Sequence, residues 1–321
     1  MPTPSSRSCV TRPPAPLKCP WLVFSHGKHK STQTFYNVAE DCYYVKSIPD
    51  MCQKYICASC HGWLVIMDIN SDDFFLLNPV SMEKIELPPW NSFTLESCVL
   101  SLPPSNPNCI VVVFAASLGE PYIRFCRPGD CRWIDCELGS LLEMLRFPTT
   151  CNGKIYGLTK VKGSLATLEF VGSNVSVRKL VTEKRPWPSL PGITQSGAHL
   201  VESGGELYLV ITALVGEAAK LRDVEVFKMD FQSLTWLEVE SLGDRAFFVD
   251  GNWGNSVSCS SAASRIKGNA IYYIDGRRDK NLYVFHLKDR SLSVSLPLPK
   301  FHHLLDTLWV MPEIQEHAKL D

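Results

Sequence analysis

Residues 267–296 read KGNAIYYIDGRRDKNLYVFHLKDRSLSVSL and show the clearest copy of a pattern that recurs along the chain. This stretch holds three runs rich in β-branched and aromatic residues, at 270–275, 282–287 and 292–296, with short polar turns between them. Runs of this composition bounded by turn residues favour β-strands. The stretch therefore predicts a three-stranded antiparallel meander.

Five further segments of the chain fit the same template. The segments recur at intervals of roughly 45 to 63 residues, near the period of kelch-type propeller blades. The residues that head the later copies are Gly62, Asn108, Gly153, Gly205 and Gly268. The predicted strands of the five segments are 21–24, 34–36 and 43–48; 63–67, 74–77 and 84–87; 110–114, 122–125 and 132–136; 154–158, 166–170 and 175–180; and 207–212, 224–229 and 235–239.

An additional apolar segment precedes each later triplet, and we expect it to form the innermost strand of that blade. Residues 54–58 and 257–263 are examples. The first triplet lacks such a segment, whereas the chain ends with a spare one at 308–311. If this strand completes the first blade, the ring closes and protects the sheet edges that an open array would expose. The sequence thus predicts an all-β, six-bladed, kelch-like β-propeller closed by its C-terminal strand.

Little helix is expected in such a fold. One candidate lies at 140–147, where Ser140 and Glu143 have the spacing of a capping box.

The ends of the chain differ from the repeating body. Residues 1–18 contain five prolines and almost nothing apolar, which predicts a disordered tail. We place the propeller at 19–312 and a short C-terminal tail at 313–321.

Charge and hydropathy exclude some classes of protein. The formal net charge of −1 argues against a nucleic-acid binder. No apolar run reaches the roughly 20 residues needed to cross a bilayer, so we expect no membrane partner. The start of the chain lacks the apolar segment of a secretory signal, which favours the cytoplasm or nucleus. Its acid-free, arginine-containing composition keeps organelle targeting open.

Several motifs resemble those of a known plant family. They are Ser59-Cys60-His61-Gly62-Trp63-Leu64-Val65, Phe75-Leu76-Leu77-Asn78-Pro79 and Ile85-Glu86-Leu87-Pro88-Pro89. On these motifs the chain is identified as a member of the domain-of-unknown-function 295 family, the KIB-type F-box β-propeller proteins, over nearly all of 19–312. The resemblance implies a propeller that presents substrate.

Such proteins commonly carry an N-terminal F-box that docks to the Skp adaptor of a cullin ubiquitin ligase. In residues 1–18, Val10 and Leu17 are the only large aliphatic residues. We therefore expect this segment to form no F-box, and we expect no docking to a Skp-type adaptor by that route.

The thirteen cysteines call for separate treatment. Most lie inside apolar runs, where a thiol behaves as a small hydrophobe, and an odd number without an export signal favours reduced thiols. Cys57, Cys60 and His61 fit the C-x-x-C-H pattern of haem attachment, but no export signal or second axial ligand accompanies them. The spacing of Cys126, Cys131 and Cys136 does not match zinc modules. We expect no cofactor, no metal and no catalytic residue.

Binding residues are expected on one end of the propeller. In a four-stranded blade, the loop between the second and third strands emerges on the same side as the connection to the next blade. Trp and Arg are enriched in binding hot spots, and several charged and aromatic residues fall in these loops. The candidate partner-binding residues are Lys28, Lys30, Asp72, Trp187, Trp253, Arg277, Arg278 and Asp279. Trp90, Asp244, Arg245 and Asp250 fall in predicted connections at the same end.

These observations favour a protein-interaction platform, related to F-box proteins, that binds an unidentified protein partner. Two alternatives stay open. One is a propeller enzyme that uses loop carboxylates, such as Asp72, Asp73, Glu120 or Asp250, at the central mouth. The other is an organelle-targeted member of the family.

Overall fold

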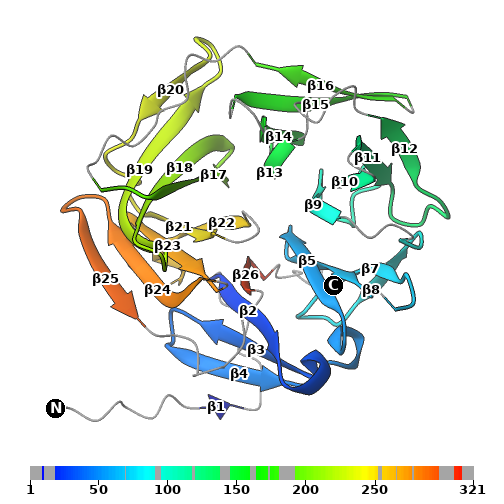
Figure 1. The fold of residues 1–321 in the computed structure, drawn as a ribbon, viewed down its shortest axis with the longest axis horizontal. Helices are drawn as coiled ribbons and strands as arrows, with labels where there is room; N and C mark the ends of the chain where they lie inside the picture. Colours follow the sequence, from blue (N-terminus) through cyan, green and yellow to red (C-terminus); the bar gives the residue numbers. More distant parts are fainter. Residues whose placement is uncertain are drawn as a thin grey trace, which may run out of the picture.

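The structure is a computed structural model. It describes residues 9–10, 19–68, 70–90, 95–117, 120–137, 145–159, 164–172, 174–180, 192–251, 255–264, 266–276, 278–295 and 307–312. Six β-sheets stand around a central axis like the blades of a propeller (Figure 1). The predicted all-β, six-bladed fold is confirmed.

Blades 2 to 5 each contain four antiparallel strands, and the chain runs from the channel to the rim in each. Blade 2 consists of β5 (Tyr55–Cys60), β6 (Trp63–Met67), β7 (Phe74–Leu77) and β8 (Lys84–Leu87). Blade 3 consists of β9 (Leu95–Leu100), β10 (Val111–Ser117), β11 (Glu120–Cys126) and β12 (Ile134–Glu137). Blade 4 consists of β13 (Leu145–Cys151), β14 (Lys154–Thr159), β15 (Leu165–Val171) and β16 (Asn174–Lys179). Blade 5 consists of β17 (Gln195–Ser203), β18 (Glu206–Val215), β19 (Lys220–Asp230) and β20 (Thr235–Glu238).

Blade 1 is completed by the end of the chain, as the spare strand predicted. Its strands are β2 (Trp21–His26), β3 (Thr32–Asn37), β4 (Cys42–Lys46) and the innermost β26 (Thr307–Val310). Two short 3-10 turns, η1 (Lys28–Lys30) and η2 (Pro49–Met51), accompany this blade. Strand β26 pairs antiparallel with β2, with Leu22 opposite Trp309. The ring is therefore closed by strands from the two ends of the described chain.

Blade 6 departs from the template by one strand. Its order is β22 (Ser256–Ser260), β21 (Arg245–Asp250), β23 (Ala270–Asp275), β24 (Asp279–His286) and β25 (Ser291–Ser295). Strand β21 lies between the inner strand and β23 and runs parallel to β23. The prediction of a connection through Arg245 and Asp250 was wrong, because the apolar residues between them pair on both sides within the sheet.

Six hydrophobic clusters fill the spaces between consecutive blades. Strand β6 shows how the sequence does this. Leu64 packs toward blade 1 and Val65 toward blade 3, and each is completely buried. Because both faces of a sheet meet a neighbouring blade, strands with continuous apolar sequence are stable here.

The turns between the first and second strands repeat one geometry. His61 and Gly62 have φ values of 49° and 76°, and Asn152 and Gly153 have 50° and 72°. Two residues with positive φ form the type I′ turn that suits a two-residue β-hairpin. The residues that head the predicted repeats are therefore, in these blades, the turns that start the second strand.

One further expectation is corrected. Leu145, Arg146 and Phe147 lie in strand β13, not in a helix, because this segment supplies the inner strand of blade 4. Residues 140–144 lie outside the described part. Within the expected N-terminal tail, Cys9–Val10 form a short strand, β1, that pairs parallel with β4 at the outer edge of blade 1. The outer edge of a sheet presents unpaired backbone groups that such a segment can use.

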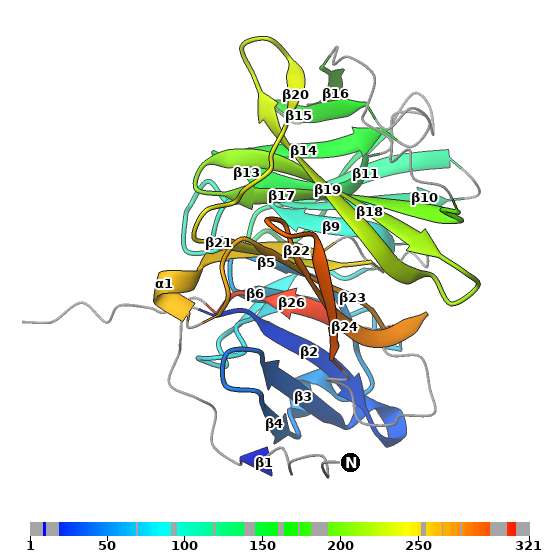
Figure 2. The same cartoon turned by 90° about the vertical axis from the view of Figure 1, so that its left-hand side faces the viewer.

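One α-helix, α1 (Ser261–Ser264), follows β22 in the described part of the chain. In side view it projects from one face of the ring (Figure 2).

Candidate functional site

The two ends of the channel are distinguished by their loops. The hydroxyls of Ser256 and Ser258 in β22 donate to the carbonyls of Leu200 and Glu202 in β17, so these two inner strands run in the same direction along the channel. We call the end that carries the turns between first and second strands the hairpin end. The opposite end carries the loops between second and third strands, and we call it the connection end.

Four of the predicted binding residues are placed at the connection end with their side chains described. Lys28 and Lys30 lie in η1 of blade 1, Asp72 lies between β6 and β7 of blade 2, and Arg278 precedes β24 of blade 6. Blades 6, 1 and 2 are neighbours in the ring (Figure 1). Lys28, Asp72 and Arg278 are exposed, whereas Lys30 is half-buried.

The remaining predicted residues are only partly covered by the structure. Asp279 begins β24 opposite Asp275, and its side chain lies outside the described residues. Trp187, Trp253 and Arg277 lie outside the described residues as well.

The η1 loop is held in place by buried hydrogen bonds. Gln33 is completely buried; its side-chain amide donates to the carbonyl of Lys30 at 2.8 Å and accepts from the Ile48 amide at 2.8 Å. The Lys30 ammonium lies 3.4 Å from the ring centroid of Tyr55 in blade 2, a cation–π contact. Lys30 is therefore engaged within the protein, and Lys28 is the more accessible cation of the pair.

The loops that carry Asp72 and Arg278 are also held by backbone hydrogen bonds, and that of Arg278 runs from its amide to the Asp275 carbonyl. The Trp90 amide donates to the Asp72 carbonyl at 2.7 Å, which ties the β6–β7 loop to the connection that leaves blade 2. Arg278 hydrogen-bonds Gln195 of blade 5 and approaches the Asp275 carboxylate to 3.8 Å. The side chain of Arg278 is still half exposed.

Other residues expected at this end are placed differently. Trp90 is 2% exposed and packs edge-on against Trp133 at 5.8 Å, so its indole belongs to the core between blades 2 and 3. Asp244 accepts a hydrogen bond from Ser260 at the hairpin end. Arg245 starts β21 beside it, so the pair lies at the end opposite to the one predicted. Asp250 is completely buried and accepts from Thr307 at 2.7 Å, which makes it part of the ring closure.

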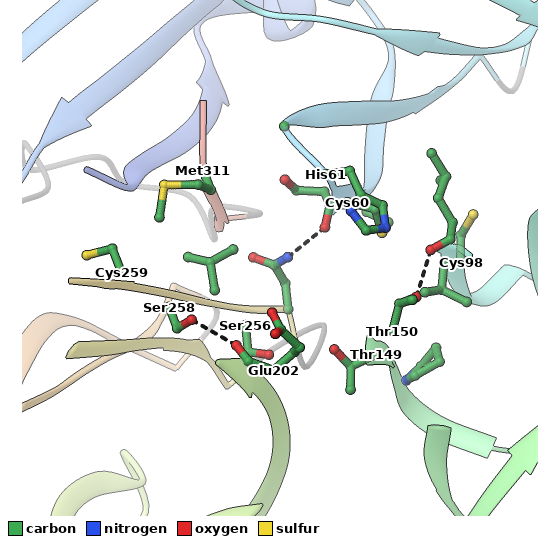
Figure 3. Close-up of a pocket in the computed structure, with 18 of the residues that line it drawn as sticks. Cys60, His61, Cys98, Thr149, Thr150, Glu202, Ser256, Ser258, Cys259 and Met311 are labelled. Atoms are coloured by element: carbon green, nitrogen blue, oxygen red, sulfur yellow. Dashed lines mark hydrogen bonds between the residues drawn. The ribbon is translucent and has the colours of Figure 1, made fainter. Parts of the chain in front are cut away.

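Sequence reasoning missed a cavity of about 770 Å³ at the hairpin end of the channel. Its wall comes from the inner strands of the blades and from the residues that follow them (Figure 3). The residues that line it include Ala58, Ser59, Cys60, His61, Ser97, Cys98, Thr149, Thr150, Glu202, Asn255, Ser256, Ser258, Cys259 and Met311. Cavities of this size accept small organic ligands or single side chains.

The small residues of the inner strands are a sequence feature that indicates this cavity. The inner strands are rich in small residues, as in Cys57-Ala58-Ser59-Cys60 and Ser258-Cys259-Ser260. Where inner strands converge on an axis, small side chains leave space along it. The local pattern predicts the strands but does not show that these residues face one another.

The ionisable groups that line the cavity differ in the direction of their pKa shifts and in their charge at pH 7. Burial raises the pKa of Cys60 and of Cys259 to about 11 and holds the pKa of Cys98 well above its usual value, so these thiols are neutral at pH 7. Burial also lowers the pKa of His61, while the nearby Glu202 carboxylate opposes that shift. Among the lining residues that the structure describes, Glu202 is the only carboxylate, and there is no lysine or arginine.

The cysteines form no disulfide within the described part of the chain. Cys98, Cys109, Cys126, Cys151 and Cys259 are buried, as their apolar surroundings in sequence predicted. In the C-x-x-C-H segment, Cys57 and Cys60 belong to strand β5, and His61 starts the turn to β6. Over the described ranges, no group of three or more His, Cys, Asp or Glu side chains is arranged to hold a metal ion.

The fold and the cavity define a closed six-bladed β-propeller with a ligand-sized space in its channel. This chain belongs to the KIB1-4 beta-propeller family, whose family model matches residues 35–286. The family expected from the sequence motifs is thereby confirmed.

Similar proteins come from Arabidopsis thaliana. An F-box/kelch-repeat protein is 24% identical over 313 residues, which covers 92% of this chain and 82% of that protein. An F-box protein is 27% identical over 100 residues, 30% of this chain and 26% of that protein. A second F-box/kelch-repeat protein is 23% identical over 235 residues, 69% of this chain and 60% of that protein. The matched part is thus less than two thirds of the second and third relatives.

Among solved structures, the Cps50 (Swd1) β-propeller domain of Myceliophteria thermophila is 11% identical, with a TM-score of 0.41 over 89% of this chain and 88% of that chain. None of the helices in the described residues has the length and apolar character needed to cross a membrane.

Proposed function

We propose that this propeller is a protein-binding module of the substrate-receptor kind, which holds a partner protein at its connection end and performs no chemistry of its own. The observation that carries the proposal is the set of exposed charges on fixed loops of blades 6, 1 and 2, namely Arg278, Lys28 and Asp72. Membership of the family and similarity to Arabidopsis proteins named as F-box/kelch-repeat proteins support the same role.

Fixed loops favour binding for a physical reason. A loop that is already ordered loses little conformational entropy when a partner docks, so more of the contact energy appears as affinity. The Gln33 bridges across η1 and the backbone bond between Trp90 and Asp72 supply that order. Charges of both signs on neighbouring blades favour a partner with a complementary pattern and select against others.

The chemistry of the cavity supports binding over catalysis. A general acid–base pair needs two groups whose pKa values lie near the working pH. The cavity thiols have pKa values well above 7, and burial lowers that of His61, so the lining residues supply Glu202 without a matched proton donor.

The test begins with capture of partners from a plant extract by the immobilised full-length chain. Each partner identified by mass spectrometry is then purified, and its affinity for the chain is measured. The variant Lys28→Ala/Arg278→Ala should weaken binding at least tenfold, since interface anchors typically contribute about 2 kcal/mol or more.

A matched control is Arg132→Ala/Lys288→Ala. These two residues are exposed in the turns β11–β12 and β24–β25 at the hairpin end. The control should leave affinity unchanged, and both double variants should keep the melting temperature of the parent. Equal affinity in the two double variants would overturn the choice of face.

A further inference from the structure

Glu202 is a carboxylate in the wall of the central cavity, and the described lining residues include no lysine or arginine to oppose its charge. One of its oxygens, Oε1, accepts a hydrogen bond from the Gly205 amide at 2.8 Å, within the turn after β17. Within the described part of the chain, neither lysine nor arginine forms an ion pair with it. A carboxylate in a partly enclosed, low-dielectric space interacts strongly with any cation that reaches it.

Most other polar groups of the wall are already occupied by the protein. The hydroxyls of Thr150 and Ser258 donate to the carbonyls of Leu100 and Glu202 in the neighbouring blades (Figure 3). Both polar atoms of the Asn255 side chain have partners, because its amide nitrogen donates to the Ser59 carbonyl and its oxygen accepts from the Trp309 amide. The wall therefore offers Glu202 as its principal group for a charged ligand.

The rest of the lining is apolar or neutral. Cys98, Cys259, Val257 and Met311 present carbon and sulfur, and the pKa values of both thiols lie far above 7. A ligand that fits this wall combines an apolar stem with one positive group. The side chain of arginine or lysine and small aliphatic amines or guanidines have this composition.

We propose that the hairpin-end cavity binds an organic cation, with Glu202 as its countercharge. The ligand is either an arginine or lysine side chain of a polypeptide or a free small molecule of the same chemistry. A metal ion is a poor fit, since hard cations prefer several oxygen ligands and the cavity supplies one carboxylate. An anion would be repelled by Glu202, and the described part of the lining offers it no lysine or arginine.

The experiment uses the full chain and three defined probes in isothermal titration calorimetry. n-Butylguanidinium supplies the cation on an apolar stem, n-butylurea is its neutral isostere, and the blocked peptide acetyl-Gly-Arg-Gly-amide supplies the same group on a polypeptide. Either cation should bind more tightly than the urea, by roughly ten- to a hundredfold, the usual contribution of a charged hydrogen bond.

The variants isolate the carboxylate. Glu202→Gln keeps an oxygen for the Gly205 amide and removes the charge, so the preference for the cations should be lost. Glu202→Asp keeps the charge and should retain part of the preference. Glu217→Gln is the matched control, because Glu217 is exposed in the turn between β18 and β19. This control should bind the probes as the parent does.

The outcomes distinguish a polypeptide side chain from a free cation as the ligand, and they test the cavity site separately from the partner surface. Tighter binding of the peptide than of n-butylguanidinium assigns the site to a polypeptide arginine, and equal or weaker binding assigns it to a free cation. Equal affinity for cation and urea, or unchanged affinity in Glu202→Gln, overturns the proposal. The variant Lys28→Ala/Arg278→Ala should bind the probes as the parent does. The proposal of a cation site in the cavity and the proposal of a partner surface at the connection end can therefore be disproved independently.

Discussion

Thr307 and Asp250 close the ring through a hydrogen bond between two side chains that are both completely buried. The Thr307 hydroxyl donates to the Asp250 carboxylate at 2.7 Å. Thr307 starts the C-terminal strand of blade 1, and Asp250 ends the additional strand of blade 6. The bond thus joins the first and last blades at the connection end.

Replacing Thr307 by valine should lower the free energy of unfolding by about 1.5–3 kcal/mol. The valine has the same shape but removes one hydrogen bond to a buried carboxylate. A hydrogen bond to a charged group contributes about 1.5–3 kcal/mol. Urea denaturation monitored by tryptophan fluorescence measures the change. Thr235→Val, at a partly exposed position of the outer strand β20, should change stability far less. A Thr307→Val variant as stable as the parent would show that the bond contributes nothing to closure.

Deletion of residues 308–321 should destabilise the whole propeller. Leu308, Trp309 and Val310 of β26 are at most 3% exposed, and burial of each such side chain contributes about 1.5–3 kcal/mol. The sum approaches the total stability of about 5–15 kcal/mol that is usual for a folded domain. Circular dichroism against temperature is the measurement, and a deletion that begins at residue 313 and leaves β26 intact is the control. A melting temperature that the longer deletion leaves unchanged would contradict closure by β26.

The sequence predicts strands more reliably than their positions within a blade. Leu64-Val65-Ile66 is apolar throughout because each side of the sheet meets another blade, and this pattern is visible locally. Strand β21 was missed although Ala246-Phe247-Phe248-Val249 is apolar, since a meander template contains only antiparallel neighbours. Its parallel pairing with β23 joins Ala246 to Ala270 and depends on contacts outside either segment.

The same distinction between local pattern and spatial neighbours applies to the two candidate sites. The position of Lys28 and Asp72 at one end follows from strand count alone, which the sequence supplies. The cavity around Glu202 depends on side chains from several blades facing one axis, and only the folded ring brings them together. Trp90 was misinterpreted for the related reason that a residue in a connection can be buried by strands of two blades.

Trp90→Ala should destabilise the protein by about 3–5 kcal/mol, the usual cost of truncating a large buried aromatic side chain. Trp90 is 2% exposed, its ring centroid lies 5.7 Å from that of Phe74, and the Arg124 guanidinium lies 5.1 Å from it. Chemical denaturation gives the difference in unfolding free energy. Trp236→Ala, on the partly exposed outer strand of blade 5, should cost less. If Trp90→Ala has the same unfolding free energy as the parent, the Trp90 indole does not contribute to the core.

Stability should depend on pH through His199. The imidazole is 2% exposed, packs against Tyr273 at 6.2 Å and Phe147 at 5.7 Å, and finds no hydrogen-bond partner for either nitrogen in the described part of the structure. Burial lowers its pKa from 6.5 to about 4. Between these values the unfolded chain takes up a proton that the folded chain does not, so the free energy of unfolding falls as pH drops from 6.5 to 4. Above pH 6.5 both states are neutral, and the group adds no pH dependence.

The size of this effect is about 3 kcal/mol at its limit, because each unit of pKa shift corresponds to about 1.4 kcal/mol. His199→Phe keeps an aromatic ring between Phe147 and Tyr273 and cannot be protonated. Carboxylates titrate in both proteins over the same range, so the informative quantity is the difference between their unfolding free energies, measured by urea denaturation at intervals from pH 7.5 to 4. The parent should lose stability relative to His199→Phe as the pH falls through this window. A difference that stays constant from pH 6.5 to 4 would mean that His199 is protonated to the same extent in the folded and unfolded chains, and that the buried imidazole does not set the acid sensitivity of the propeller.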